Sequence, residues 1–138
     1  MSTIYGTLPK RIDLSVAAGE LLLKLTKRNG PLMFHQSGGC CDNSAANCYL
    51  PGEITMGAGD VYLGDIGGSP FYIGLGQYEY WKHTHIEIDV VPGRGGGFSL
   101  ETPEGFRFII RSRLFTDAEY EVLKYSPVLL GNGEYKLV

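Results

Sequence analysis

The stretch Lys82-His83-Thr84-His85-Ile86-Glu87-Ile88-Asp89-Val90-Val91 carries the clearest pattern in the chain. Successive side chains of a β-strand point to opposite faces of its sheet. The alternation therefore predicts a strand whose apolar face is made by Thr84, Ile86, Ile88 and Val90. The other face receives two imidazoles and two carboxylates, from His83, His85, Glu87 and Asp89.

This polar face has two interpretations at the level of the sequence. It can be the solvated side of an antiparallel sheet, because Arg107, Arg111 and Arg113 share one phase of a later strand and can pair with its carboxylates. It can also be a metal site, because His83 and His85 would lie about 6.5–7 Å apart along the strand and can share an ion. A neighbouring carboxylate would complete a ligand set typical of zinc or non-haem iron.

Outward from this strand, the pattern predicts a single α+β domain over residues 1–138. A leucine stripe with caps at both ends predicts a helix at about 15–28. Short apolar runs between turn residues predict strands at 32–36, 61–63, 71–73, 78–91, 98–101, 107–114 and 134–138. Thr116, with Glu119 three residues later, predicts a short C-terminal helix. We expect the N-terminal helix to pack on a mainly antiparallel β-sheet or a small β-sandwich.

Composition narrows the classes of function. The chain has 138 residues and a formal net charge of -3, and it contains no apolar run of the roughly 18 residues that a membrane span needs. Such a mild charge gives no reason to expect nucleic acid or a membrane as a partner. The N-terminus does not resemble a signal peptide, so we expect a soluble, cytoplasmic protein. In that compartment clustered cysteines more often serve as thiols or metal ligands than as disulfides.

All the cysteines of the chain lie close together, at Cys40, Cys41 and Cys48. Three interpretations stay open. The thiolates can bind a metal together with His35 or with the histidines of 83–85. One of them can be a reactive thiol with a histidine as its base, or all three can be small side chains that fill space in a core. Their spacing does not match the Cys-x2-4-Cys knuckle of zinc fingers, which leaves room for a ligand from elsewhere in the chain.

Several motifs together resemble a known family. His35-Gln36-Ser37-Gly38-Gly39-Cys40-Cys41-Asp42 and the segments 80–85, 90–101 and 111–115 are similar to a small bacterial family, the uncharacterised domain of unknown function 779. Its members are often encoded beside aldehyde or alcohol dehydrogenases, so the resemblance implies a role in aldehyde metabolism with such a dehydrogenase as partner. A weaker resemblance, through Gly39-Cys40 and Gly97-Phe98-Ser99-Leu100, is to the A-type iron–sulfur carrier proteins, whose C-terminal Cys-Gly-Cys this chain lacks.

The expected function is a metal-binding accessory protein linked to aldehyde or alcohol metabolism, with iron or zinc as the metal. The expected ligands are Cys40, Cys41, Cys48, His83 and His85, with His35 and Glu87 as further candidates. One alternative is a thiol-dependent enzyme that acts on small aldehyde-derived compounds, with Cys40 or Cys41 as nucleophile. Another is a module that contacts a dehydrogenase through the aromatic residues at 78–81. The sequence leaves open whether the protein is an enzyme.

Overall fold

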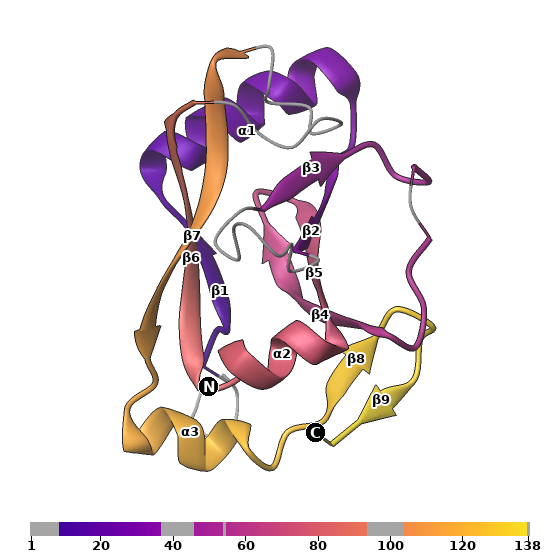
Figure 1. Ribbon diagram of the computed structural model, residues 1–138, viewed down its shortest axis with the longest axis vertical. Helices are drawn as coiled ribbons and strands as arrows, with labels where there is room; N and C mark the ends of the chain where they lie inside the picture. The colour runs from indigo at the N-terminus through magenta and orange to yellow at the C-terminus, as the bar shows by residue number, and fades with distance from the viewer. Residues whose placement is uncertain (1–8, 37–45, 54, 94–103, 138) are drawn as a thin grey trace, which may run out of the picture.

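Two β-sheets and three helices make up the part of the chain that the computed structural model describes, which is residues 9–36, 46–53, 55–93 and 104–137 (Figure 1). The elements follow in the order β1 (Ile12–Leu14), α1 (Val16–Asn29), β2 (Met33–Gln36), β3 (Asn47–Tyr49), β4 (Asp60–Ile66), β5 (Ser69–Gly74), α2 (Leu75–Trp81), β6 (Thr84–Pro92), β7 (Phe106–Leu114), α3 (Asp117–Leu123), β8 (Val128–Leu130) and β9 (Tyr135–Lys136). This is the α+β class that the sequence predicts, with an N-terminal helix and a short C-terminal helix.

Helix α1 forms where the leucine stripe and its caps predict a helix. Ser15 is the N-cap, and its Oγ accepts a hydrogen bond from the N–H of Ala18 at 3.1 Å. Ala18, Leu22 and Leu25 recur at three- and four-residue steps and are buried. The helix ends at Gly30, whose φ of 82° lies in the left-handed region that glycine adopts readily. The sequence prediction at 15–28 is therefore confirmed.

The histidine strand, β6, is the middle strand of a three-stranded sheet in the order β1-β6-β7. Strand β1 runs parallel to β6, and β7 runs antiparallel to it along its whole length. Ile86 and Ile88 are buried, whereas Glu87 between them is exposed. The predicted alternation of a core face and a polar face along this strand is therefore confirmed.

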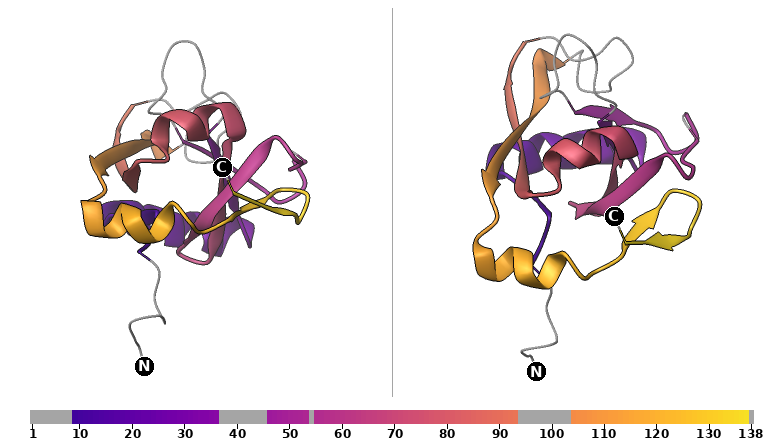
Figure 2. Two further views of the ribbon diagram at one scale, coloured as in Figure 1. Left: turned by 90° about the horizontal axis from the view of Figure 1, so that it is seen from below. Right: turned by 60° about the horizontal axis from the view of Figure 1, so that its bottom comes forward.

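The second sheet has six strands in the order β3-β2-β5-β4-β8-β9. Its neighbouring strands pair antiparallel, except that β2 and β5 run parallel. Both views of Figure 2 show this sheet and the three-stranded sheet on opposite sides of the molecule. The predicted, mainly antiparallel character is confirmed. The two parallel pairs, β1–β6 and β2–β5, were not predicted, because the sequence indicated only hairpin connections between neighbouring strands.

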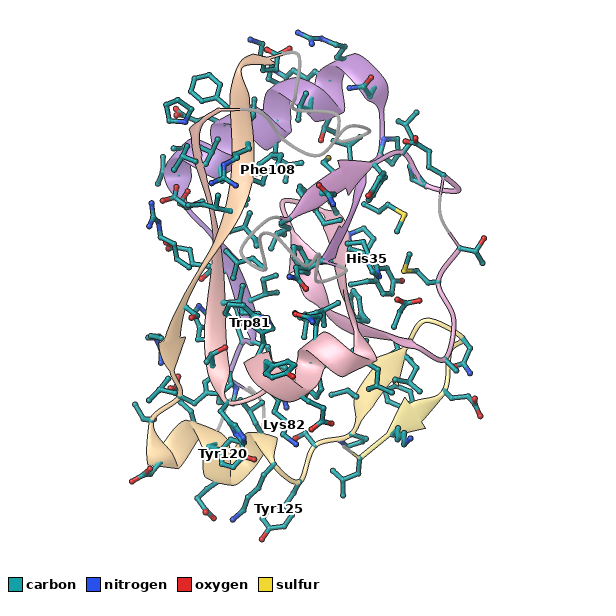
Figure 3. All side chains as sticks on the ribbon, viewed as in Figure 1. His35, Trp81, Lys82, Phe108, Tyr120 and Tyr125 are labelled. Carbon is teal, nitrogen blue, oxygen red and sulfur yellow. The ribbon has the colours of Figure 1, made fainter. Side chains whose placement is uncertain are left out.

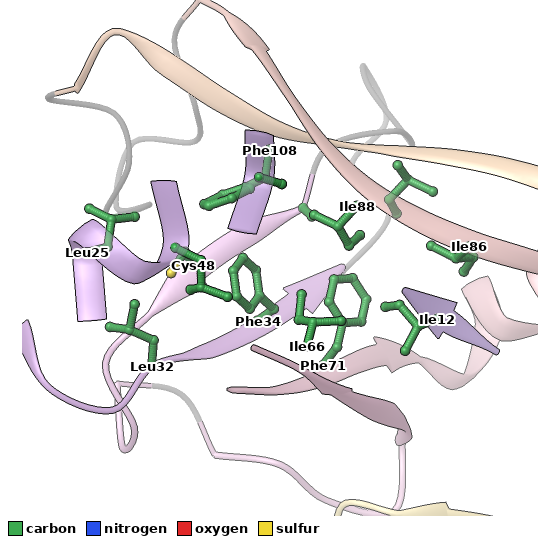
Figure 4. Close-up of a cluster of buried hydrophobic side chains, with 14 residues drawn as sticks. Ile12, Leu25, Leu32, Phe34, Cys48, Ile66, Phe71, Ile86, Ile88 and Phe108 are labelled. Carbon is green, nitrogen blue, oxygen red and sulfur yellow. The ribbon is translucent and has the colours of Figure 1, made fainter. Parts of the chain in front are cut away.

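One hydrophobic core joins α1 to both sheets (Figure 4). The ring of Phe34, from β2, stacks on Phe71 of β5 with 5.9 Å between centroids. It also meets Phe108 of β7 edge to face, at 5.0 Å and an interplanar angle of 84°. Such aromatic pairs contribute about 0.5–1.5 kcal/mol each beyond the burial of their area. Phe34 therefore connects the six-stranded sheet to the three-stranded sheet.

Residues 78–91 do not form the single strand that their aromatic and β-branched content predicts. Helix α2 extends to Trp81, and β6 begins only at Thr84. Tyr78 is 2% exposed and Tyr80 is 78% exposed, whereas in a strand these two residues would share a face. An aromatic run this short is compatible with the period of a helix and with that of a strand. In the structure it is helical, and Tyr78 of the helix is buried in a second small core.

Three short strands are also absent from the prediction, namely β1, β3 and β8. Each has three residues, too few to show a period of two in the sequence. Each forms by pairing with a strand that a long stretch of chain separates from it: β1 with β6, β3 with β2, and β8 with β4. The strand expected at 98–101 lies outside the described residues.

The C-terminal helix α3 has the predicted capping box. The Oγ1 of Thr116 accepts the N–H of Glu119 at 3.2 Å, and Oε1 of Glu119 accepts the N–H of Thr116 at 2.9 Å. Among the described residues, no helix has the length and apolar character that crossing a membrane requires.

Candidate functional site

A buried histidine and a carboxylate from separate strands meet in the six-stranded sheet. His35 of β2 is 8% exposed, and its Nε2 lies 2.7 Å from Oδ1 of Asp60, the first residue of β4. The other carboxylate oxygen, Oδ2, accepts the N–H of Gly57 at 3.0 Å. An ionised carboxylate can only accept hydrogen bonds, so Nε2 is the donor of this pair, and in the neutral form of the ring the proton is on Nε2. Asp60 therefore sets both the orientation and the tautomer of His35.

The local sequence explains how this pair forms. Phe34 points into the core, so His35, the next residue of the same strand, points to the other side of the sheet. Strand β5 lies between β2 and β4, and Asp60 reaches past its end, where Gly74 is its register partner. The turn before β4 places the N–H of Gly57 beside the carboxylate of Asp60, because the N–H of Asp60 also donates to the carbonyl of Gly57 at 3.1 Å.

Two tyrosines continue this face of the sheet beyond His35. Tyr72 of β5 is the register partner of His35, and Tyr62 of β4 is the register partner of Tyr72. The two phenol rings lie 5.6 Å apart, and the hydroxyl of Tyr62 donates to Oδ1 of Asp65 at 2.6 Å. Burial, and then the hydrogen bond and charge of Asp65, raise the pKa of Tyr62 above its ordinary value. Tyr62 therefore stays a neutral phenol at physiological pH.

The other two histidines lie near the start of β6. The Nδ1 of His85 is 2.9 Å from the carbonyl oxygen of Lys10, which can only accept, so this nitrogen carries the proton. His83 precedes the strand, and its ring meets Tyr120 of α3 with 5.0 Å between centroids. Figure 3 shows Tyr120 on α3 at one end of the molecule and His35 among the strands of the six-stranded sheet.

His35 and His85 face away from each other. Phe34 and Ile86, which neighbour them in sequence, both belong to the core that lies between the two sheets. Because side chains alternate along a strand, His35 and His85 lie on the outer sides of their respective sheets. The structure therefore does not bring His35 together with the predicted site at His85.

Arginines of β7 lie beside the polar side chains of β6. Glu87 lies opposite Arg111 in the strand ladder, and His85 lies opposite Arg113. The Nε of Arg111 donates to Oδ2 of Asp89 at 2.7 Å, and together with a weaker contribution from Ser15 this holds the pKa of Asp89 at about 2. The arrangement matches the interpretation of this face as a solvated, charge-paired sheet surface. An open pocket of about 290 Å³ lies there, lined by His85, Glu87, Arg111, Ser112 and Arg113.

The cysteines divide into one that the structure describes and two that it does not. Cys48 of β3 is fully buried, opposite Phe34 in the ladder and within the hydrophobic core (Figure 4). It therefore lies on the inner side of the sheets, away from both His35 and His85. Cys40 and Cys41 lie outside the described residues. Within residues 9–36, 46–53, 55–93 and 104–137, no group of three or more His, Cys, Asp or Glu side chains is arranged to hold a metal ion.

Sequence reasoning missed Asp60, Tyr62 and Tyr72 as parts of a site. Asp60 carried one local signal, because it follows the turn Gly57-Ala58-Gly59 directly and precedes an apolar strand. An acid at that position is well placed to accept turn N–H groups. Nothing local connects it to His35, 25 residues earlier in the chain.

The comparisons with known proteins give one match. A family model described as a domain of unknown function (DUF779) matches residues 21–114, which include the C-terminal part of α1, the histidine pair and both strands of the β6–β7 hairpin. No curated protein matches the chain. No solved structure matches it either.

Proposed function

The chain belongs to the DUF779 family, a domain of unknown function, and we propose that it is a metal-binding accessory protein whose metal, iron or zinc, is held by His35 together with cysteine thiolate. The observation that carries the proposal is the buried pair of His35 and Asp60 at 2.7 Å. A carboxylate that accepts one imidazole N–H is the usual outer partner of a metal-binding histidine, because it fixes the tautomer and raises the basicity of the other ring nitrogen.

The proposed site is centred on His35 and not on His83 and His85. His83 and His85 keep their status as candidate ligands from the sequence, but His85 lies in a pocket that it shares with two arginines. Guanidinium groups beside an ion disfavour a cation electrostatically. The same pocket also contains the carboxylate of Glu87, but His35 is hydrogen-bonded directly to a carboxylate, which favours a cation.

Cys40 and Cys41 are the proposed thiolate ligands. Cys40 follows His35 by five residues, and a chain of that length spans up to about 17 Å, so the sequence permits a shared ion. Thiolate with imidazole is a ligand set that suits zinc and iron. Cys48, buried against Phe34, takes no part in this proposal.

The test is the metal content of the purified protein. The chain is expressed with iron or zinc supplied, purified without chelator, and analysed for metal per chain, alongside His35→Ala, Cys40→Ser and Cys41→Ser. His85→Ala is the matched control, because it removes an imidazole on the opposite side of the molecule. We expect metal in the wild type and in the control, and its loss in His35→Ala and in at least one cysteine variant. Absence of metal from the wild type under every supply condition would contradict the proposal.

A second candidate function uses the same pair. An imidazole oriented by a carboxylate is also the base of a cysteine nucleophile, so a thiol-dependent enzyme acting on small aldehyde-derived compounds has the same support from His35 and Asp60. Its test is the rate of thiol alkylation in metal-free protein as a function of pH. Fast alkylation at neutral pH that His35→Ala slows would favour the enzyme, and the slow rate of an ordinary thiol, with a pKa of about 8.5, would exclude it.

The partner that the family resemblance implies, an aldehyde or alcohol dehydrogenase, is part of the proposal. One surface of the described chain supports a protein contact. Tyr80 of α2 is 78% exposed and borders a pocket of about 290 Å³ with Gln77, Trp81 and Thr84. Exposed tyrosine beside tryptophan is common at protein interfaces. The test is whether the chain is retained by a purified dehydrogenase. Retention that Tyr80→Ala abolishes, and that Tyr125→Ala at another exposed tyrosine leaves intact, would support this partner. Equal retention of both variants would exclude this surface.

A further inference from the structure

We propose that the open edge of β7, from Ile110 to Leu114, binds an extended acidic segment of a partner protein, which adds to the three-stranded sheet as a fourth strand. This edge belongs to the three-stranded sheet, whereas the proposed metal site at His35 belongs to the six-stranded sheet. The backbone groups of β7 and the charge of its side chains both favour such a strand.

The direction of the backbone groups follows from the hydrogen bonds of β6. Ile86 donates its N–H to the carbonyl of Arg11 at 2.8 Å, and the carbonyl of Ile88 accepts the N–H of Ser15 at 2.9 Å, so these residues point their backbone groups away from β7, toward the N-terminal strand. The alternating residues His85 and Glu87 bond to β7 instead, through their ladder partners Arg113 and Arg111.

Ile110 and Ser112, the ladder partners of Ile88 and Ile86, therefore direct their backbone groups outward, away from β6. At one end of the strand this direction is visible in a contact, because the carbonyl of Phe108 accepts the N–H of Ala46 at 3.3 Å. Further along, the carbonyl of Leu114 accepts Nη1 of Arg113 at 3.2 Å. Among the described residues no backbone partner faces Ile110 or Ser112. An edge of unpaired N–H and C=O groups is a template for strand addition.

The side chains of this edge specify the charge of the added strand. Arg111, Ser112, Arg113 and Leu114 are all exposed, Leu114 at 75%. Arg111 and Arg113 point to the same side, and side chains of an added strand opposite them would lie directly beside their guanidinium groups. Arg111 uses only its Nε on Asp89, so its terminal amino groups remain to bind a carboxylate.

A second copy of this chain is a poor occupant of the edge. In an antiparallel pairing of β7 with itself about a two-fold axis, outward residues must pair with outward residues. Centring the pair on Ser112 sets Arg111 opposite Arg113 of the other copy, and centring it on Arg111 or Arg113 sets an arginine opposite itself. Like charges directly opposite destabilise a sheet. An acidic strand reverses the sign of each of these contacts.

The room for acidic side chains is also present. The pocket of about 290 Å³ on the outer face of β6 and β7 is lined by the two arginines, by Ser112, by His85 and by one carboxylate, that of Glu87. Carboxylates on alternate residues of an added strand would enter it from the open side. Glu119, which accepts both terminal amino groups of Arg113, anchors that arginine at the end of the edge.

The test uses the full chain and two fluorescent peptides of seven residues, Val-Glu-Val-Glu-Val-Glu-Val and its counterpart with lysine in place of glutamate. Fluorescence anisotropy at low salt gives the affinity, and amide NMR shifts locate the site. We expect the glutamate peptide to bind at least about ten-fold more tightly than the lysine peptide, with affinity falling as salt screens the charges. The shifted amides should centre on Ile110, Ser112 and Leu114.

Two variants of the edge and one control complete the test. Arg111→Gln/Arg113→Gln removes the charge, and Ser112→Pro removes an outward N–H that no strand of the described chain uses. Each should weaken the glutamate peptide about ten-fold or more, while Arg28→Gln, an exposed arginine on α1, should not. Equal binding of both peptides, no binding by about 1 mM, or full binding by both edge variants would overturn the proposal. A stable dimer in light scattering that Ser112→Pro dissociates would show instead that the occupant is a second copy.

Discussion

The carboxylate of Asp60 holds two donors at once, Nε2 of His35 at 2.7 Å and the N–H of Gly57 at 3.0 Å. Because each of its oxygens has its own donor, the carboxylate cannot rotate without losing one of them. This double hold distinguishes His35 from the other two histidines, whose described contacts are to a backbone carbonyl and to aromatic rings. It is the reason that the proposed function is centred on His35.

The pairing of Asp89 predicts a dependence of stability on pH. Arg111 foremost, then Ser15 and the N–H of Val90, hold the pKa of Asp89 at about 2, below its ordinary 3.8. A carboxyl whose pKa is lower in the folded state stabilises the fold fully above its unfolded pKa. We therefore expect this contribution to be lost as the pH falls from about 4 to about 2. Carbon-13 NMR titration of the Asp89 carboxyl should give a midpoint near 2 that rises toward 3.8 in Arg111→Gln; equal midpoints would contradict the assignment.

The capping box of α3 predicts a moderate loss of stability in Thr116→Ala. The substitution removes the hydroxyl that accepts the N–H of Glu119 at 3.2 Å. Loss of such an N-cap costs about 1 kcal/mol in the free energy of unfolding. Urea denaturation followed by circular dichroism measures it. Thr116→Ser, which keeps the hydroxyl, is the matched control and should lie within about 0.5 kcal/mol of wild type.

The contacts of Phe34 predict a large loss in Phe34→Ala. The ring packs against Phe71 and Phe108 and is fully buried, so its removal leaves a cavity between the two sheets. We expect the free energy of unfolding to fall by about 3–5 kcal/mol in a denaturant titration. Tyr135→Ala, at a residue that is 70% exposed, should change it by less than about 0.5 kcal/mol. Similar effects of both variants would show that Phe34 does not join the sheets.

The turn between β4 and β5 offers a matched pair of glycines. Gly67 and Gly68 both have positive φ, at 54° and 83°. A Cβ at Gly67 would lie 2.8 Å from Cδ2 of Leu22, whereas one at Gly68 would meet nothing within 4 Å. Gly68→Ala should therefore cost only the conformational strain, about 1–2 kcal/mol, and Gly67→Ala should cost more, because the side chain of Leu22 must move as well. Thermal unfolding of the two variants compares them directly, and a smaller loss in Gly67→Ala would contradict the packing of α1 on this turn.

Local patterns in the sequence were sufficient for the elements that carry their own signals. The Ser15 cap and leucine stripe predicted α1, the Thr116 and Glu119 box predicted α3, and the alternation after Thr84 predicted both faces of β6. In each case the hydrogen bonds or the buried face that stabilise the element lie within a few residues of one another.

The features that the sequence did not predict depend on contacts between distant residues. Strand β1 exists as a strand because Ile12 pairs with Ile86, and α2 is accompanied by the burial of Tyr78 against β8 and β5. The pair of His35 and Asp60 is of the same kind, since it joins the first and third of three adjacent strands. The sequence therefore identified His35 as a candidate ligand and gave no means to choose it over His83 and His85.

The zinc affinity of Asp60→Asn, measured by competition with a chromophoric chelator, tests whether Asp60 prepares His35 to bind the metal. The asparagine is nearly isosteric, but the N–H of Gly57 needs an oxygen beside it, which turns the amide nitrogen toward His35. That nitrogen can only donate, so Nε2 must accept and the proton moves to Nδ1, the nitrogen proposed to bind the metal. We expect affinity to fall about 10–100-fold, with no change in the control Asp65→Asn on the same strand. Unchanged affinity in Asp60→Asn, with metal lost in His85→Ala, would contradict a metal site at His35.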